Sequence, residues 1–470
     1  MIGQVLTAML LGLGTCGMGA AFGRWVSRRI ALPTSTNAAV SLLLGIAGVG
    51  VLTLAIGHLG LLGPWVPWLI AGFGLIAGWP ARKDALRFVQ RAAAAIAAEA
   101  RTRPLLAAGA AVAGLTALVA TLAPPQRIDE VEYHWPAPLD WAASGGWTDS
   151  PFRHVDGFPL MEIIYTAAAT QGSYVAAHAM SLLTMVGIGL AAAGMVQSLG
   201  LTARLPVAAA AVLMPVVWDG SYAAYNDTPG AAFTIAAAAV AVGIQRPSRA
   251  ATALISALLA AAISIKPFHV VAVCCVALLL WHRFRRASLR SSATMAAVAV
   301  ATVAFWSVRQ WAYTGHLIDP LMFGGASGEA QARLPSRIQH LLAPIFPFVS
   351  GVLGAQEPWG ARTSAVLQVF LIPSLVYLVW SGRSAFGRFG VLAGPAYLHW
   401  VVLGFVAVRT RFHIFTWVLL VPAVAYAVHH ASKRWPRLGP WLDLAWTALV
   451  LLGALDVSFE MWRAINTIRT

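Results

Sequence analysis

Residues 104–123 read PLLAAGAAVAGLTALVATLA and contain no charged side chain. A helix rises about 1.5 Å per residue, so as a helix this stretch would be about 30 Å long, the thickness of the hydrocarbon core of a bilayer. Similar apolar runs recur along the chain, in which 59% of the residues are hydrophobic and 10% are charged. A soluble domain carries about a quarter charged residues. The sequence therefore predicts an all-α fold, a polytopic transmembrane helical bundle with about 12–14 spans.

The predicted spans are apolar runs bounded by charged or turn-forming residues. They lie near residues 2–22, 37–57, 65–80, 104–123, 173–198, 205–218, 229–245, 250–264, 268–281, 291–309, 361–380, 391–408, 412–430 and 441–460. Two connections, 124–172 and 310–360, are much longer than the others, and we expect them to carry short interfacial helices. One such helix is predicted near 133–142. The Ala-rich segment 91–100 follows several basic residues, which predicts a further amphipathic or interfacial helix.

The formal net charge of +15 is distributed in a way that indicates an orientation in the membrane. Alternate connections carry most of the 32 Lys and Arg residues, whereas most of the 17 Asp and Glu residues fall on the other side. Because cytoplasmic loops are enriched in Lys and Arg, the basic side is predicted to be cytoplasmic and both long loops to lie outside. The basicity thus follows from topology, and no nucleic-acid partner is expected.

The first long loop opens with a cluster of acidic residues, Ile128-Asp129-Glu130-Val131-Glu132-Tyr133-His134-Trp135-Pro136. On a helix the adjacent Asp129 and Glu130 diverge by about 100°, so they are not expected to form one symmetric pair. A carboxylate here can accept the proton of an attacking hydroxyl, a contribution of roughly 10²–10⁴ in rate. We predict Asp129 as that base and Glu130 as its helper. The alternative is a solvated acidic loop, the interpretation we favour for Glu132.

Cations at the predicted outer ends of spans form a second group of candidates. Lys266 lies in the short turn Ile265-Lys266-Pro267, Arg411 lies in another short turn, and Arg309 ends a span. Charge at membrane depth needs a partner, which here is either a carboxylate such as Asp227 or the phosphate of a bound lipid. An ion pair and a phosphate contact remain open for each cation. Asp227 also has a structural alternative as the cap of the helix that follows it.

Histidines near these carboxylates raise the question of a metal. His134, His154, His316 and His413 fall in the outer connections, but their spacing matches no strong metal signature. A lone histidine is more often a packed or hydrogen-bonding group. No metal ligands are therefore assigned, and a divalent metal is left open.

Several separate motifs follow one another between about residues 104 and 430. They are Asp129–Pro136, Phe158-Pro159-Leu160-Met161-Glu162, Ala224-Tyr225-Asn226-Asp227, Lys266, Arg309–Pro320 and Arg411-Phe412. In this order they resemble the GT-C class of membrane glycosyltransferases, and more narrowly its bacterial polyprenyl-phosphate-sugar-dependent members. The chain departs from that family in two places. Three predicted spans (2–22, 37–57 and 65–80) come before the apolar run 104–123 that leads into the acidic loop, where the family usually has one span before this loop. In addition, His316-Leu317-Ile318-Asp319 replaces a run containing Asn-Pro.

The resemblance implies transfer of a sugar from a polyprenyl-phosphate donor to an acceptor hydroxyl on a glycan, lipid or protein. The enzyme would be a multi-pass protein of the bacterial inner membrane, with its active site on the periplasmic or extracellular face among membrane lipids. Asp129 would be the general base of an inverting attack, assisted by Glu130. The implied contacts with substrate or donor are Tyr133, His134, Glu162, Asp227, Lys266, Arg309, His316 and Arg411. No cofactor is implied with certainty.

The resemblance also implies a division of the chain into three parts. Residues 104–360 would form the catalytic transmembrane core, including the outer loops 124–172 and 310–360. Residues 1–103 would add N-terminal transmembrane helices and a cytoplasmic linker, and residues 361–470 would add C-terminal transmembrane helices.

Other function classes remain open for the same residues. A transporter or a lipid-linked glycan flippase would line a pathway with these charges and move substrate without breaking a bond. An enzyme like the O-antigen ligases or polymerases would use a diphosphate-linked glycan, and a membrane scaffold would need no acid–base residues. Charged residues gather at one face, and few lie inside the spans. This distribution favours an enzyme over a transporter.

Overall fold

The computed structural model describes residues 1–148, 157–314, 365–381, 383–404 and 410–467. Within these ranges every regular element is a helix, which confirms the all-α prediction. His316 and most of the predicted loop 310–360 lie outside the described residues.

The helices of the first part of the chain run from the N-terminus to residue 198. They are α1 (Ile2–Arg29), α2 (Thr34–His58), α3 (Val66–Gly78), η1 (Trp79–Ala81), α4 (Arg82–Thr102), α5 (Pro104–Ala120), η2 (Glu130–His134), α6 (Pro136–Ser144), α7 (Leu160–Ala169) and α8 (Tyr174–Ser198).

The helices that follow begin with two short elements and end with the long C-terminal helix. They are α9 (Arg204–Val212), α10 (Pro215–Asp219), α11 (Asp227–Gly243), α12 (Arg249–Ile265), η4 (Pro267–His269), α13 (Val270–Phe284), η5 (Arg285–Ser288), α14 (Leu289–Thr314), α17 (Ala365–Ser381), α18 (Arg383–Gly404), η9 (Thr410–His413), α19 (Ile414–Arg434) and α20 (Gly439–Thr467).

Six helical segments of the described chain are long and apolar enough to cross a membrane: Ile2–Arg29, Thr34–His58, Tyr174–Ser198, Pro267–Tyr313, Arg411–Arg434 and Gly439–Phe459. Shorter apolar helices accompany them: Pro104–Ala120, Leu160–Ala169, Asp227–Gly243, Arg249–Ile265, Ala365–Ser381 and Phe389–Leu403. The helix lengths thus agree with a membrane protein, while the total of about 12–14 spans and the orientation stay predictions.

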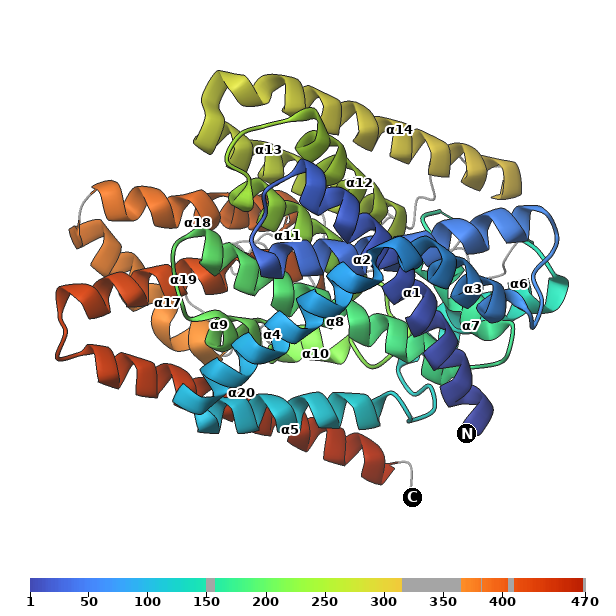
Figure 1. Cartoon of the computed structure of the whole chain (residues 1–470), viewed down its shortest axis with the longest axis horizontal. Helices are drawn as coiled ribbons and strands as arrows, with labels where there is room; N and C mark the ends of the chain where they lie inside the picture. Colours follow the sequence, from blue (N-terminus) through green and yellow to red (C-terminus); the bar gives the residue numbers. More distant parts are fainter. Residues whose placement is uncertain (149–156, 315–364, 382, 405–409, 468–470) are drawn as a thin grey trace, which may run out of the picture.

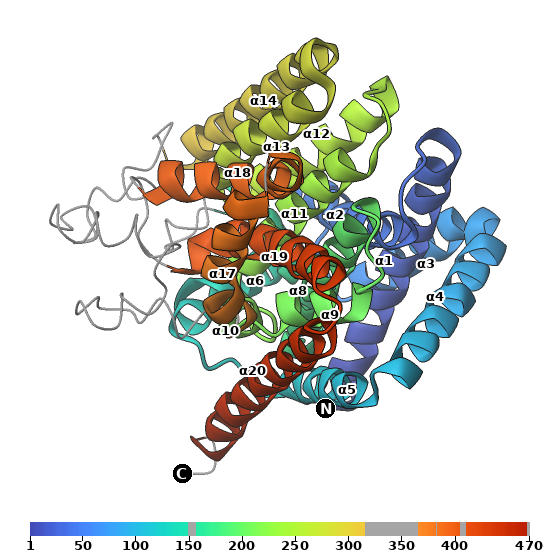
Figure 2. The same ribbon diagram turned by 90° about the vertical axis from the view of Figure 1, so that its left-hand side faces the viewer.

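The largely buried helices of the bundle include α7, α8, α11 and α19. Every residue of α7, and every residue of α11 from Asp227 to Val242, is buried. α11 packs against α8, α12 and α19. In Figures 1 and 2, α14 lies along one edge of the bundle and α5 with α20 along the opposite edge, with α8, α11 and α19 between them. More than half of the residues of α11 are Ala or Gly, so its backbone lies close to its neighbours. At Gly230, for example, a Cβ atom would be only 2.2 Å from Nε2 of His269.

Two regions differ from the sequence-based prediction. Residues 160–169, expected inside the loop 124–172, form the fully buried helix α7. Its apolar residues pack on α2, α6 and α8, so tertiary contacts stabilise a segment too short to cross a membrane. The predicted span 205–218 is interrupted between α9 and α10, where Met214 is extended (ψ 128°). Pro215 disfavours a helical conformation at the residue before it, which explains the break.

The segment around 91–100 is helical, as predicted, and lies on the outside of the bundle as α4 (Figures 1 and 2). It has no buried residue, and its exposed apolar side chains include Leu86, Val89 and Ile96. Glu99 attaches it to the body of the protein, since its Oε1 accepts a hydrogen bond of 3.0 Å from the amide of Leu205. Its location at a membrane surface stays a prediction.

Glycines bring α1 and α3 into backbone contact. A Cβ at Gly17 would lie 2.1 Å from the carbonyl oxygen of Gly74, and a Cβ at Gly74 would lie 2.5 Å from that of Gly14. Helices that associate between lipids use small residues in this way, because close approach of the backbones maximises van der Waals contact.

We therefore expect Gly74→Val to destabilise the protein, because the side chain must push α1 and α3 apart. Overpacking of this kind costs about 1–3 kcal/mol or more. The matched control is Gly72→Val on the same helix, where a Cβ has no atom within 4 Å. Thermal unfolding in detergent should give a clearly lower Tm for Gly74→Val than for Gly72→Val, and equal Tm values would disprove the contact.

Candidate functional site

The acidic segment folds into one wide helical turn. The amide of Trp135 donates a 3.0 Å hydrogen bond to the carbonyl of Glu130, five residues earlier, so η2 is a single π-helical turn. Pro136 then begins α6. Turns of this kind are frequent at functional sites. Here the turn sends the side chains of Asp129 and Glu130 into different surroundings.

Asp129 belongs to a chain of alternating charges that we call the ion-pair chain: Asp129, Arg411, Asp227 and Lys266. Arg411 Nη1 lies 2.6 Å from Asp129 Oδ2, and Arg411 Nε lies 3.4 Å from Asp227 Oδ2. Asp227 Oδ1 pairs with Lys266 Nζ. The Asp227 side chain is 6% exposed, whereas those of Asp129, Lys266 and Arg411 are 19–25% exposed. The most buried charge therefore lies between two cations.

The ends of several helices position these four residues. Asp227 is the first residue of α11, where a negative charge also interacts favourably with the helix dipole. Lys266 directly follows α12, and Arg411 lies in η9 just before α19. The ion-pair chain consequently connects three helices with the acidic turn.

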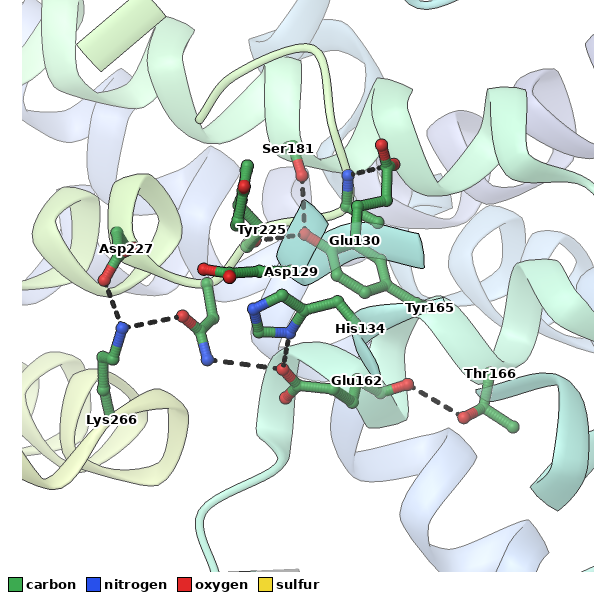
Figure 3. Close-up of polar contacts among 12 residues, drawn as sticks. Asp129, Glu130, His134, Glu162, Tyr165, Thr166, Ser181, Tyr225, Asp227 and Lys266 are labelled. Carbon is green, nitrogen blue, oxygen red and sulfur yellow. Dashed lines mark hydrogen bonds and ion pairs between the residues drawn. The ribbon is translucent and has the colours of Figure 1, made fainter. Parts of the chain in front are cut away.

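Asn226 connects the ion-pair chain to a second pair, His134 and Glu162, which Figure 3 shows near Asp227 and Lys266. Its Oδ1 accepts a 3.1 Å hydrogen bond from Lys266 Nζ, and its Nδ2 donates a 3.3 Å hydrogen bond to Glu162 Oε1. The same oxygen of Glu162 is 2.6 Å from His134 Nδ1. The other oxygen, Oε2, is buried and has no hydrogen-bond partner among the described residues.

Aromatic rings surround the two cations. Lys266 Nζ is 4.6 Å from the ring centre of Phe412, and the Arg411 guanidinium is 5.9 Å from that of Tyr225. Burial and the nearby Asp129 carboxylate raise the pKa of Tyr133, and raise that of Tyr225 to about 12. Burial lowers the pKa of Lys266; Asp227 opposes this shift and Arg411 adds to it. The raised pKa values keep the phenols of Tyr133 and Tyr225 neutral near pH 7.

Glu130 lies in a separate buried environment. Its Oε1 is 2.6 Å from His178 Nε2 and accepts a 2.8 Å hydrogen bond from the amide of Ala224, while Oε2 accepts one of 3.2 Å from the amide of Gln126. His178 Nδ1 is 3.2 Å from the carbonyl oxygen of Thr121. Burial raises the pKa of Glu130, but the contacts with His178 and the two amides outweigh it, so the net shift is downward.

Most of the site residues predicted from the sequence meet in one place. The ion-pair chain gathers Asp129, Asp227, Lys266 and Arg411. His134 and Glu162 join it through Asn226, and the ring of Tyr133 is tilted against that of His134 with 4.2 Å between ring centres.

Two predicted residues lie apart. Glu130 contacts His178, and Arg309 on α14 packs over the rings of Trp306 and Tyr313 at 5.6 and 4.9 Å. His316 is outside the described residues.

Sequence reasoning missed two connecting residues. Asn226 lies in the motif Ala224–Asp227, and its amide joins the two halves of the site. His178 lies inside the apolar run that forms α8. A lone imidazole in such a run needs a buried polar partner, and this requirement is the feature of the sequence that points to it. In the described part of the chain, no group of three or more His, Cys, Asp or Glu side chains is arranged to hold a metal ion.

The environment of Glu130 yields a prediction about stability and pH. Because folding lowers its pKa, the carboxylate stabilises the protein above the ordinary Glu pKa of about 4.5, and this contribution disappears as the pH falls through the folded value. Glu130→Gln should therefore destabilise the protein at pH 7, by about 1–3 kcal/mol, and less at acidic pH.

Thermal unfolding of the wild type and Glu130→Gln from pH 7 to pH 3.5 tests this. The exposed Glu132→Gln is the control and should change Tm little at any pH. A difference between wild type and Glu130→Gln that is independent of pH would contradict the assignment.

Comparison with known proteins gives no relative for this chain. No protein-family model matches it, and neither a curated protein nor a solved structure is detectably similar to it.

Proposed function

We propose that this protein is a membrane glycosyltransferase that moves a sugar from a polyprenyl-phosphate donor to an acceptor hydroxyl. The observation that carries the proposal is the ion-pair chain, in which two cations at the ends of apolar helices pair with carboxylates and stay partly exposed. A phosphate carried by a lipid can reach such cations while its chain lies among the helices.

The first argument concerns the phosphate. Lys266 offers three donors and Arg411 a planar fork, the two arrangements that proteins use for phosphate. Cleavage of the bond between the sugar and the phosphate adds a negative charge to the departing lipid phosphate. Cations fixed in a site that excludes water stabilise this charge most effectively. An incoming phosphate would replace the carboxylate of Asp129 on Arg411, leaving the more buried Asp227 in place.

The second argument concerns the acceptor. Its hydroxyl must lose a proton as it attacks the anomeric carbon, and the site holds Asp129 and His134 as proton-accepting groups within one network. Tyr133 and Tyr225, neutral near pH 7, supply hydroxyl groups for hydrogen bonds with a sugar. A transporter needs a pathway for charge but not this combination of phosphate ligands and bases.

A direct assay tests the proposal. The full-length protein, reconstituted in liposomes, is given radiolabelled undecaprenyl-phosphate hexoses and pentoses together with envelope lipid and polysaccharide fractions as acceptors. We expect release of undecaprenyl phosphate with transfer of one sugar, and a product of inverted anomeric configuration. Movement of an intact donor across the bilayer without bond cleavage would instead favour a flippase.

The role of Lys266 can be separated from its contribution to folding. Lys266→Met leaves the buried Asp227 with one cation, so we expect lower stability, by about 1–3 kcal/mol, as well as loss of transfer. Adding Asp227→Asn removes the uncompensated charge and should recover much of the Tm but not the activity. Lys83→Met, at an exposed lysine of α4, is the matched control. Full activity in the double variant would contradict a phosphate-binding role.

A further inference from the structure

His134 is held in a fixed orientation by a carboxylate. Its Nδ1 lies 2.6 Å from Glu162 Oε1, and because an ionised carboxylate only accepts hydrogen bonds, Nδ1 carries the hydrogen. In the neutral ring Nε2 is then the basic nitrogen. Figure 3 shows this second nitrogen directed away from Glu162, toward Asp129. Tyr133 and Tyr225 pack on the imidazole with ring centres 4.2 and 5.6 Å away, so the ring has little freedom to turn.

Glu162 is suited to stabilise a positive charge on this ring. Its side chain is 1% exposed, and Oε2 has no hydrogen-bond partner within the described chain, so part of the carboxylate charge is not compensated by hydrogen bonds. Oε1 binds His134 and is kept in position by the amide of Asn226. A base oriented by a third group in this way is the general arrangement of catalytic dyads and triads.

Asp129 is less suited to accept a proton. Its Oδ2 is already occupied by a cation, since Nη1 of Arg411 lies 2.6 Å away. Arg411 is the cation that the proposed function assigns to the donor phosphate. Asp129 therefore occupies the place of the phosphate oxygens until the donor binds, and afterwards it can accept a hydrogen bond from a sugar hydroxyl.

We propose that His134, oriented by Glu162, is the general base of the transfer, an inference that rests on the proposed function. The acceptor oxygen forms the new bond to the anomeric carbon while its proton moves to His134 Nε2. The bond between the anomeric carbon and the phosphate oxygen breaks, and its electron pair leaves with the lipid phosphate, held by Lys266 and Arg411. The imidazolium that results is paired with Glu162 and later returns its proton to water.

The experiment compares His134 and Asp129 in the same reconstituted protein, using the donor that the wild type accepts. His134→Gly should lower kcat by about 10²–10⁴-fold, and added imidazole should restore part of it. His134→Gln provides a second variant of nearly the same size, not rescued by imidazole. Asp129→Asn should lower kcat less than tenfold. His282→Gln, at an exposed histidine in the last turn of α13, is the control.

A binding assay with undecaprenyl phosphate distinguishes a loss of catalysis from a loss of donor binding. Both His134 variants should bind this lipid as the wild type does, whereas Asp129→Asn should bind it more tightly because Arg411 has lost a competing carboxylate. The assignment is overturned if Asp129→Asn loses activity and His134→Gln keeps it, or if imidazole does not rescue a folded His134→Gly. If the wild type transfers sugar from no donor, the proposed function itself fails, and the base assignment with it.

Discussion

The burial of Asp227 between Lys266 and Arg411 is the interaction on which the rest of the site depends. A lone carboxylate at 6% exposure would be strongly unfavourable, and removing one partner of a buried pair is more destabilising than its net contribution suggests. The three residues belong to the start of α11, the end of α12 and the turn before α19, so satisfying this charge fixes three helices relative to one another. Arg411 extends the constraint to the acidic turn through Asp129.

Next to Asp227 and its two cations, the wide turn of η2 directs three side chains of the acidic segment to different partners. Asp129 completes the ion-pair chain, Glu130 anchors the turn to α8 through His178, and His134 meets Glu162 on α7. The anchor uses both oxygens of Glu130 and both ring nitrogens of His178, so it is a rigid support. A site assembled from helix ends needs such supports, because its residues lie far apart in the sequence.

Much of the fold follows from composition, since an apolar run of about twenty residues has few options besides a helix. The sequence places α8 and α12 within a residue or two, and it names the members of the ion-pair chain because charge is conspicuous in this chain. It fails where local pattern and tertiary context disagree. Residues 160–169 are too few to cross a membrane, yet their neighbours bury them as α7. The partner of Glu130 is a histidine inside an apolar run. Arg309 packs over the rings of Trp306 and Tyr313 in its own helix, and its contact with substrate stays a prediction.

The central claim, that Lys266 and Arg411 form a binding site for the phosphate of a lipid, is tested most directly by binding. Affinities of the reconstituted protein for undecaprenyl phosphate and for undecaprenol, which lacks the phosphate, are measured side by side. We expect the phosphate-bearing lipid to bind at least about tenfold more tightly, a difference of about 1.4 kcal/mol, and Lys266→Met with Asp227→Asn to abolish that preference. Equal affinity for the two lipids, or a preference unchanged in the double variant, would contradict the account.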